Sequence, residues 1–363
     1  MFDIVEIETP RLLKKADHYL LEPPITVTAE QCERSAGGRH DFYSEGDYWW
    51  PDLSNPNGPY IRKDGLSNPD NFVAHRKAMM RLSDIIGTLA SLYKMTGESA
   101  YAKRAVNHLK AWFVDEDTKM NPSLLYGQAI KGRHTGRSIG IIDTIHLVEV
   151  ALGAKVLLGA PEFLKSDQSG VIGWFRIYLD WLNSHPYGQT EREHPNNHGV
   201  CWSLQAAAFA TLVGDEAQLA EIRQRLKTIY ITEMMNQDGG FPAELARTKP
   251  YGYSLFMIDV MAGVAQLAST PEDDLWTFEL PDGRGMRKGI EFIAPFIKNK
   301  EAWPLPADVM YWDEWPVRHP SLLLAGLKFS NPEYLALWQK FEPDPTAYEV
   351  LRNLPMRHPL IWY

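Results

Sequence analysis

Apolar residues recur at intervals of three and four along most of the chain, the spacing of amphipathic helices. The clearest stripe is Met79, Leu82, Ile86, Leu89 and Tyr93. Gly97 follows this stripe as a residue suited to end a helix. A second stripe covers residues 101–112, and similar stripes cover 137–159, 170–184, 199–213, 215–236, 252–268, 285–299 and 331–341. The pattern therefore predicts about ten helices joined by loops rich in Gly, Pro and Asp.

Alternating patterns typical of strands are scarce, and Trp276 to Leu280 is one short candidate. No shift in composition marks a domain boundary, so we expect one catalytic domain over residues 1–363. Sequential helix pairs in this number form a bundle, a solenoid or a closed toroid. The lack of a fixed-period repeat disfavours a solenoid. The predicted fold is an all-α toroid, an α/α barrel of antiparallel helix pairs.

Residues 1–71 differ from the rest because they are dense in Pro, Gly, Asn, Asp and aromatic residues. Pro51, Pro56, Pro59 and Pro69 exclude a long helix in the second part of this segment. Long ordered loops in compact domains are usually functional. We therefore expect residues 1–71 to form a loop-rich lid over the concave end of the toroid.

The composition argues against several classes of protein function. The net charge of −9 argues against a nucleic-acid partner, and no apolar stretch is long enough to insert into a membrane. The two cysteines, Cys32 and Cys201, indicate neither a disulfide framework nor a cysteine-rich metal site. The 12 tryptophans and 16 tyrosines are compatible with core packing, and also with a cleft in which flat rings contact sugars.

The densest polar cluster is Glu191 to His198, with the sequence EREHPNNH, directly before an apolar stretch. One of Asn196 and Asn197 can cap the following helix, which leaves a second amide and a histidine for chemistry. His194 and His198 also have the spacing of a metal-binding pair on one helix face. Pro195 interrupts such a helix, so metal binding is the minor alternative.

A second cluster lies within residues 239–256, where Arg247, Lys249, Tyr251 and Tyr253 precede an apolar stripe. Taken alone, it can be a solvated turn with two packing tyrosines. Combined with Asn197 and His198, it matches the needs of β-elimination on a uronate polymer.

In β-elimination, the proton on C5 of the sugar is only weakly acidic, so the adjacent carboxylate must be neutralised. Amide donors and an arginine fork suit this task. A histidine or an activated tyrosine can remove the proton, and a tyrosine hydroxyl can protonate the departing O4. Asn197, His198, Arg247 and Tyr253 supply this set without a metal or cofactor.

These residues carry a resemblance. Asn196-Asn197-His198-Gly199, Glu244-Leu245-Ala246-Arg247 with Tyr253, and Asp47 to Asp52 together resemble the alginate lyase superfamily over roughly residues 40–330. The resemblance implies an incomplete α/α toroid. It also implies that Asn197 and Arg247 neutralise the carboxylate. Tyr253 would be the acid, and also the base in syn elimination, while His198 would stabilise charge or be the base in anti elimination.

The chain departs from the better-known mannuronate lyases near the tyrosine. Tyr253 lies one residue closer to the arginine, Pro250 replaces a second arginine, and Ser254 stands in place of a histidine. The departures concern substrate preference, so alginate and glucuronan are both expected substrates. Tyr251 is the competing candidate for the acid.

Further residues are predicted to bind the polymer from the lid and from a basic loop. They are Tyr48, Trp49, Trp50, Tyr60, Arg62, Arg133, His134, Arg137, Asn196 and Tyr251. For the basic loop that carries Arg133, His134 and Arg137, an equally good interpretation is a connection whose charges are exposed to solvent.

The sequence thus predicts a polysaccharide lyase whose partner is an acidic polysaccharide. A glycoside hydrolase using Glu244 and Asp143 is one alternative, and a non-catalytic sugar-binding protein is another. Residues 1–10 have no signal-peptide pattern. Because such polymers lie outside the cytoplasm, a periplasmic or secreted protein whose signal was trimmed is expected.

Overall fold

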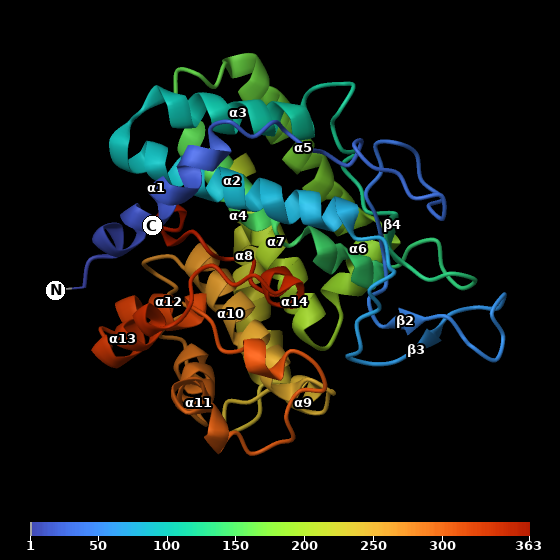
Figure 1. Ribbon diagram of the computed structural model, residues 1–363. Helices are drawn as coiled ribbons and strands as arrows, with labels where there is room; N and C mark the ends of the chain where they lie inside the picture. Colours follow the sequence, from blue (N-terminus) through green and yellow to red (C-terminus); the bar gives the residue numbers. More distant parts are fainter. Residues whose placement is uncertain (1) are drawn as a thin grey trace.

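Antiparallel helix pairs form most of the computed structural model, which describes residues 2–363 (Figure 1). Five helices make the inner layer: α2 (Ala74–Thr96), α4 (Leu147–Leu157), α7 (Asn197–Val213), α10 (Pro250–Ala268) and α12 (Pro320–Lys328). The outer helices are α3 (Ser99–Phe113), α5 (Lys165–Ser184), α8 (Glu216–Arg225), α11 (Met286–Lys298) and α13 (Pro332–Lys340).

The inner helices touch one another in chain order, α2 with α4, α4 with α7, α7 with α10 and α10 with α12. A C-terminal turn at Pro359–Ile361 packs against α2 and α4. Since α7 and α10 are apolar all round, both are buried along nearly their whole length. The fold is therefore the all-α toroid that the sequence predicts.

Most predicted helices are confirmed to within a few residues at either end. Gly97 ends α2 in the left-handed conformation, with φ of 71°, and its N–H donates to the carbonyl of Tyr93. Two predicted helices are divided. Residues 137–159 form a 3₁₀ segment, Ser138–Thr144, followed by α4, and residues 215–236 form α8 followed by a π-helical segment, Leu226–Met234.

The prediction for residues 1–71 was wrong in its first part, which contains α1 (Ile4–Tyr19). Asp3 caps α1 by accepting from the N–H groups of Val5 and Glu6, and Leu12 and Ala16 are buried on its inner face. The prolines that exclude a long helix, Pro51 to Pro69, come after α1 in the sequence, so they do not prevent this helix.

Four short strands follow from pairings that local patterns do not reveal. Strand β1 (Tyr43–Glu45) pairs in parallel with β4 (Tyr126–Ala129), and β2 (Trp49–Trp50) pairs antiparallel with β3 (Ile61–Arg62). We call residues 46–72 the arm; its β2–β3 hairpin extends to one side of the helices (Figure 1). The strand expected at Trp276–Leu280 is instead mainly a turn, because Asp274 accepts from the backbone N–H groups of Trp276 and Thr277.

Three short helices at the same end as the arm complete the structure near the site. These are α6 (Pro186–Arg192), α9 (Pro242–Leu245) and α14 (Tyr348–Arg352). The sequence pattern missed these three helices and α12. No helix within residues 2–363 is long and apolar enough to cross a bilayer.

Two glycines inside helices test how closely the inner helices pack. A Cβ on Gly153 of α4 would lie 2.5 Å from Cγ2 of Ile86 on α2, whereas a Cβ on Gly173 of α5 would meet nothing within 4 Å. We expect Gly153→Ala to lower the free energy of unfolding by about 1–3 kcal/mol because α2 and α4 must separate. Gly173→Ala should raise it by about 0.5–1 kcal/mol through helix propensity.

Denaturant unfolding of the two variants measures both changes. Equal stabilisation by the two substitutions would contradict the close approach of α2 and α4.

Candidate active site

The N-terminus of α7 places two asparagines and a histidine at one end of the toroid. Asn196 is the cap, and its Oδ1 accepts from the backbone N–H of His198 at 3.0 Å. This leaves Asn197 and His198 in the first turn, with side chains free of the capping role.

Glu244 on α9 anchors Asn197. The backbone N–H of Asn197 donates to Oε1 of Glu244 at 2.7 Å, and its Nδ2 donates to Oε2 at 2.8 Å. Burial raises the pKa of Glu244, although the two hydrogen bonds from Asn197 and the charge of Arg247 oppose the shift. Because the carboxylate fixes the amide, the Asn197 side chain is held in one orientation.

Glu191 at the end of α6 orients His198 in a similar way. Nδ1 of His198 lies 2.6 Å from Oε1 of the fully buried Glu191. A carboxylate there stabilises the N–H on Nδ1, which leaves the lone pair on Nε2. His194 lies beside this ring, with 5.1 Å between the ring centroids, and burial followed by the neighbouring His198 lowers its pKa.

Tyr253, in the first turn of α10, is surrounded by hydroxyl and cationic groups. Its Oη lies 2.6 Å from Oη of Tyr48 and accepts from Nη2 of Arg247 at 3.2 Å. The Arg247 guanidinium is 4.4 Å from the Tyr253 ring centroid, and Nζ of Lys249 is 5.3 Å from it. Burial and then Tyr48 raise the pKa of Tyr253, against the effect of the two cations. The hydroxyl therefore keeps its proton at neutral pH.

Asp64 of the arm holds one edge of Arg247. Nε and Nη2 of Arg247 donate to the two oxygens of Asp64 at 3.3 and 3.1 Å, and Thr248 donates to the same carboxylate at 3.1 Å. Burial would raise the pKa of Asp64, but its bonds to Arg247 and Arg62 lower it. Within residues 2–363, Nη1 of Arg247 forms no hydrogen bond. Nη1 is therefore the nitrogen of the Arg247 guanidinium that can donate to a ligand.

A buried ionic network behind Tyr48 joins the arm to the C-terminal helix α14. Asp47 accepts from Nη1 of Arg76 at 2.7 Å and pairs with Arg352. Glu349 pairs with Arg352 at 3.2 Å and with Lys249. The network fixes Tyr48, the neighbour of Asp47, against Tyr253.

Several of the side chains described so far line one cavity of about 240 Å³. Asn197, His198, Arg247 and Tyr253 all line this cavity. Of the predicted polymer-binding residues, Tyr48, Trp49, Arg62, Arg137 and Asn196 line it as well. The structure thus brings together two clusters that are about fifty residues apart in sequence.

Sequence reasoning missed several residues of this cavity. Arg352 and Asn353 line it, and Asp47 and Gln128 do so too. Arg352 is the last residue of a five-residue helix that is too short to show an apolar stripe, and Asn353 is its C-cap. Nothing in the local sequence indicates the contact of Arg352 with Asp47.

A family model described as alginate lyase matches residues 26–303 of the chain. The chain belongs to the alginate lyase family. The crystal structure of an alginate lyase from Bacteroides ovatus shares 31% sequence identity, covers 99% of this chain and 93% of that chain, and has a TM-score of 0.84. This family membership identifies a polysaccharide lyase.

More distant alginate lyases share the fold. Alginate lyase A1-III from Sphingomonas species A1 is 15% identical over 97% of this chain and 94% of that chain, with a TM-score of 0.58. A variant of alginate lyase A1-III complexed with a tetrasaccharide is 16% identical over 100% of this chain and 90% of that chain, with a TM-score of 0.61. A comparison with proteins of curated function gives no significant match.

Five of the residues predicted to bind polymer lie outside the cavity of this alginate lyase family member. In the arm, the Trp50 indole donates to the carbonyl of Leu66, and the Tyr60 ring faces Lys131. On the basic loop, Arg133 and His134 are exposed, and Nε of Arg133 donates to the carbonyl of Tyr60 at 2.8 Å.

Tyr251, the competing acid, is also absent from the cavity. It is fully buried, its hydroxyl donates to the carbonyl of Phe296 at 3.1 Å, and its ring packs against Trp303 and Trp312. Side chains that are two residues apart on a helix project about 200° apart around its axis. Tyr251 therefore faces the core while Tyr253 faces the cavity.

Glu244 and Asp143, the two carboxylates of the hydrolase alternative, both accept hydrogen bonds from other side chains of the protein. Glu244 holds Asn197, and Asp143 accepts from Ser44 at 2.5 Å and from Gln128 at 3.1 Å while pairing with Arg76. Neither lines the cavity, where a hydrolase needs two carboxyl groups on either side of the bond. No group of three or more His, Cys, Asp or Glu within residues 2–363 is arranged to hold a metal ion.

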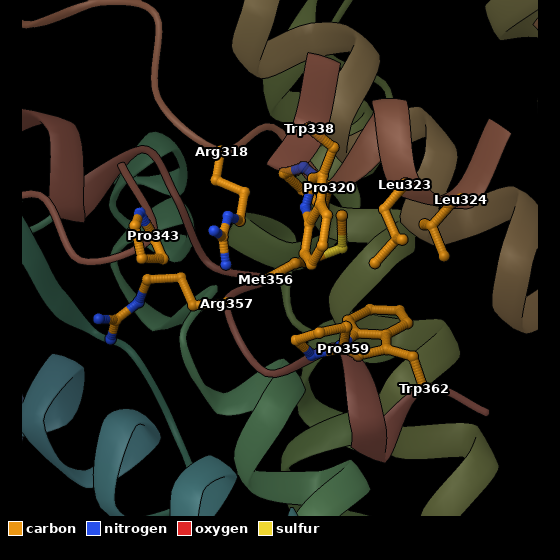
Figure 2. A pocket seen from close by; sticks show the side chains of 10 residues that line it. All are labelled: Arg318, Pro320, Leu323, Leu324, Trp338, Pro343, Met356, Arg357, Pro359 and Trp362. Carbon is orange, nitrogen blue, oxygen red and sulfur yellow. The ribbon is translucent and has the colours of Figure 1, made fainter. Parts of the chain in front are cut away.

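A second pocket lies apart from this site, beside α12, α13 and the C-terminal segment (Figure 2). Apolar side chains such as Leu323, Trp338 and Trp362 line it together with Arg318 and Arg357. Its volume of about 30 Å³ holds roughly two water molecules, so it is too small for a sugar ring.

The ion pairs of Asp47 predict how the free energy of unfolding depends on pH. Burial alone would raise the pKa of Asp47, but Arg352 and Arg76 outweigh burial and lower it to about 2. A lowered pKa stabilises the folded state above the unfolded value of about 3.9, and this contribution of about 2–3 kcal/mol at pH 7 is lost as the pH falls towards 2. Asp47→Asn should therefore destabilise the protein strongly at pH 7 and less at pH 3.

Denaturant unfolding at both pH values measures the difference, with Asp180→Asn as the control because Asp180 is exposed on α5. A destabilisation by Asp47→Asn that is the same at pH 3 as at pH 7 would show that the carboxylate charge is not the source.

Proposed function

We propose that this protein cleaves 1,4-linked uronate polymers by β-elimination, leaving a 4,5-unsaturated uronate at the new non-reducing end. Alginate is the proposed substrate, with glucuronan as the alternative polymer. The observation that carries the proposal is that Asn197, His198, Arg247 and Tyr253 line one cavity, each oriented by its own partner.

The electrostatics of the cavity favour an acidic polymer. Although the chain carries a net charge of −9, four arginines line this cavity: Arg62, Arg137, Arg247 and Arg352. Clustered cations in a recess concentrate a polyanion locally against an unfavourable overall charge.

Removal of the C5 proton requires that the substrate carboxylate accept negative charge. We assign this stabilisation to the Asn197 amide and to Nη1 of Arg247. Glu244 and Asp64 hold these donors before substrate binds, so little reorganisation is needed when charge develops.

His198 is the proposed base. With Nδ1 on Glu191, its Nε2 lone pair can take the C5 proton, and the buried Glu191 then stabilises the imidazolium. Tyr253 is the other group able to do so, as a tyrosinate in a syn reaction. The raised pKa of Tyr253 disfavours the tyrosinate and favours His198.

Tyr253 is the proposed acid. Its protonated hydroxyl donates to O4 as the bond from C4 to O4 breaks, and Arg247 and Lys249 stabilise the tyrosinate that remains. Because its polymeric substrates lie outside the cytoplasm, we also propose a periplasmic or secreted location.

The product tests this assignment. On a panel of purified polymannuronate, polyguluronate and polyglucuronate, wild-type protein should generate the ultraviolet absorbance of a C4–C5 double bond. Tyr253→Phe should lower kcat by about 10²–10⁴-fold because the leaving oxygen loses its acid. Tyr251→Phe is the matched control and should retain near wild-type turnover, since Tyr251 does not line the cavity.

Reducing ends formed without new absorbance would instead indicate hydrolysis. Loss of turnover in Tyr251→Phe but not in Tyr253→Phe would move the acid to Tyr251.

Arg247→Lys tests the neutralisation of the carboxylate at constant charge. A lysine ammonium cannot bind Asp64 along one edge while presenting a second, fixed donor to substrate. We expect kcat to fall by about 10²–10³-fold, the effect of losing one preorganised donor, with a smaller change in KM. Steady-state kinetics on the preferred polymer measures both; an unchanged kcat with a raised KM would make Arg247 a ground-state binding residue only.

A further inference from the structure

Each round of the proposed reaction changes the protonation of two side chains in the site. After elimination the C5 proton is on Nε2 of His198, and Tyr253 has given its own proton to O4 of the departing sugar. Both groups must return to their starting states before the next cleavage. The proton on His198 therefore needs a route from the cavity to bulk water.

His198 has little contact with solvent of its own. Its side chain is 15% exposed, and its Nδ1 is bound to the buried Glu191. Because His198 lines the cavity, a polymer chain bound there covers the surface that remains. The ion pair with Glu191 also stabilises the imidazolium and so opposes release of the proton. Direct loss of the proton to water is therefore hindered while polymer is bound.

His194 connects the cavity with a second hollow, which we call the outer recess. The outer recess has a volume of about 490 Å³ and is lined by residues from the end of α6, the π-helical segment and α9. Glu193 and Glu233 line it and are both exposed, so bulk water reaches it. Within residues 2–363, only His194 lines both the cavity and the outer recess.

The ring of His194 lies within reach of His198. The two ring centroids are 5.1 Å apart, a separation at which one water molecule can bridge a nitrogen of each ring. Nδ1 of His194 is buried and forms no hydrogen bond within residues 2–363. The fold therefore leaves this nitrogen free to exchange a proton.

The groups around His194 keep its ring neutral at neutral pH. Burial lowers the pKa of His194, and the charges of His198 and Arg247 lower it further, whereas Glu191 and the Asn196 amide act in the opposite direction. A neutral imidazole can accept a proton, and a lowered pKa means that the ring does not retain it.

We propose that His194 carries the C5 proton from His198 to water in the outer recess. The inference rests on the proposed function and adds the exit of the proton to it. The proton moves from Nε2 of His198 through a bridging water to His194, and from His194 to water or buffer in the outer recess. Tyr253 regains its proton from solvent, so no further reactant is needed.

Burst kinetics separate the exit of the proton from the cleavage itself. The substrate is whichever of polymannuronate, polyguluronate and polyglucuronate the wild-type protein cleaves fastest. His194→Gln keeps a polar side chain that cannot carry a proton. The first unsaturated uronate per enzyme should form at a near wild-type rate, and kcat over later turnovers should fall at least about tenfold. Stopped-flow absorbance measures both phases.

Rescue by a small buffer distinguishes proton transfer from a structural role. His194→Ala removes the ring between the cavity and the outer recess, and added imidazole should raise its kcat by at least about fivefold. Imidazole should not change the kcat of wild-type protein. His18→Gln is the matched control, because the His18 side chain is 72% exposed on α1 and lines neither hollow. It should keep the wild-type kcat with or without imidazole.

Three results would overturn the proposal: an unchanged kcat in His194→Gln, a first turnover as slow as the later ones, or a defect in His194→Ala that imidazole does not relieve. Failure of the proposed function is seen separately, as the absence of unsaturated product from wild-type protein on every polyuronate.

Discussion

The carboxylate of Asp47 is the constraint on which the site depends. It binds Arg76 from the inner helix α2 and Arg352 from the short helix α14, and it lies at the start of the arm, whose residues Tyr48, Trp49 and Arg62 line the cavity. Burying one carboxylate between two guanidinium groups is costly unless all three remain in place. The arrangement therefore fixes three distant segments relative to one another, and Tyr48, the next residue, is positioned against Tyr253 as a result.

Three of the four proposed catalytic groups are each oriented by an acidic residue that does not line the cavity. Glu244 holds Asn197, Glu191 holds His198, and Asp64 holds Arg247. These carboxylates are not placed to act as the acid and base of a hydrolase because they do not line the cavity. They instead reduce the freedom of the donors, so that the cavity is preorganised for a carboxylate that gains charge. A lyase and a hydrolase on the same toroid would differ in this use of acidic residues.

The positive cavity and the negative chain are compatible because the cations are concentrated. Lys249 is one example of a cation beside the site. Its Nζ lies 5.0 and 5.3 Å from the ring centroids of Tyr48 and Tyr253, and Glu349 pairs with it. Arg137 is the exception, with neutral partners only. Pairing three arginines with internal carboxylates limits the cost of gathering them in one cavity.

The helical class, most helix positions and the two motifs that carry the proposed chemistry follow from the amino-acid sequence alone. The apolar period of α2, α7 and α10 is a local property, and Asn197, His198, Arg247 and Tyr253 lie in short clusters whose residue types match one reaction. The resemblance to alginate lyases implies that these two clusters belong to one site.

Which of the neighbouring residues share the cavity depends on how the helices and loops pack in three dimensions. This packing separates Tyr253 from Tyr251 through the direction in which each leaves α10, and Arg137 from Arg133 through the contact with Gln128. It also brings Asp47, Asp64 and Arg352 to the site from segments whose local patterns carry no such signal. The physical reason is that helix periodicity depends on residues three or four apart, whereas ion pairs and strand pairings between segments as many as 305 residues apart depend on how the whole chain packs.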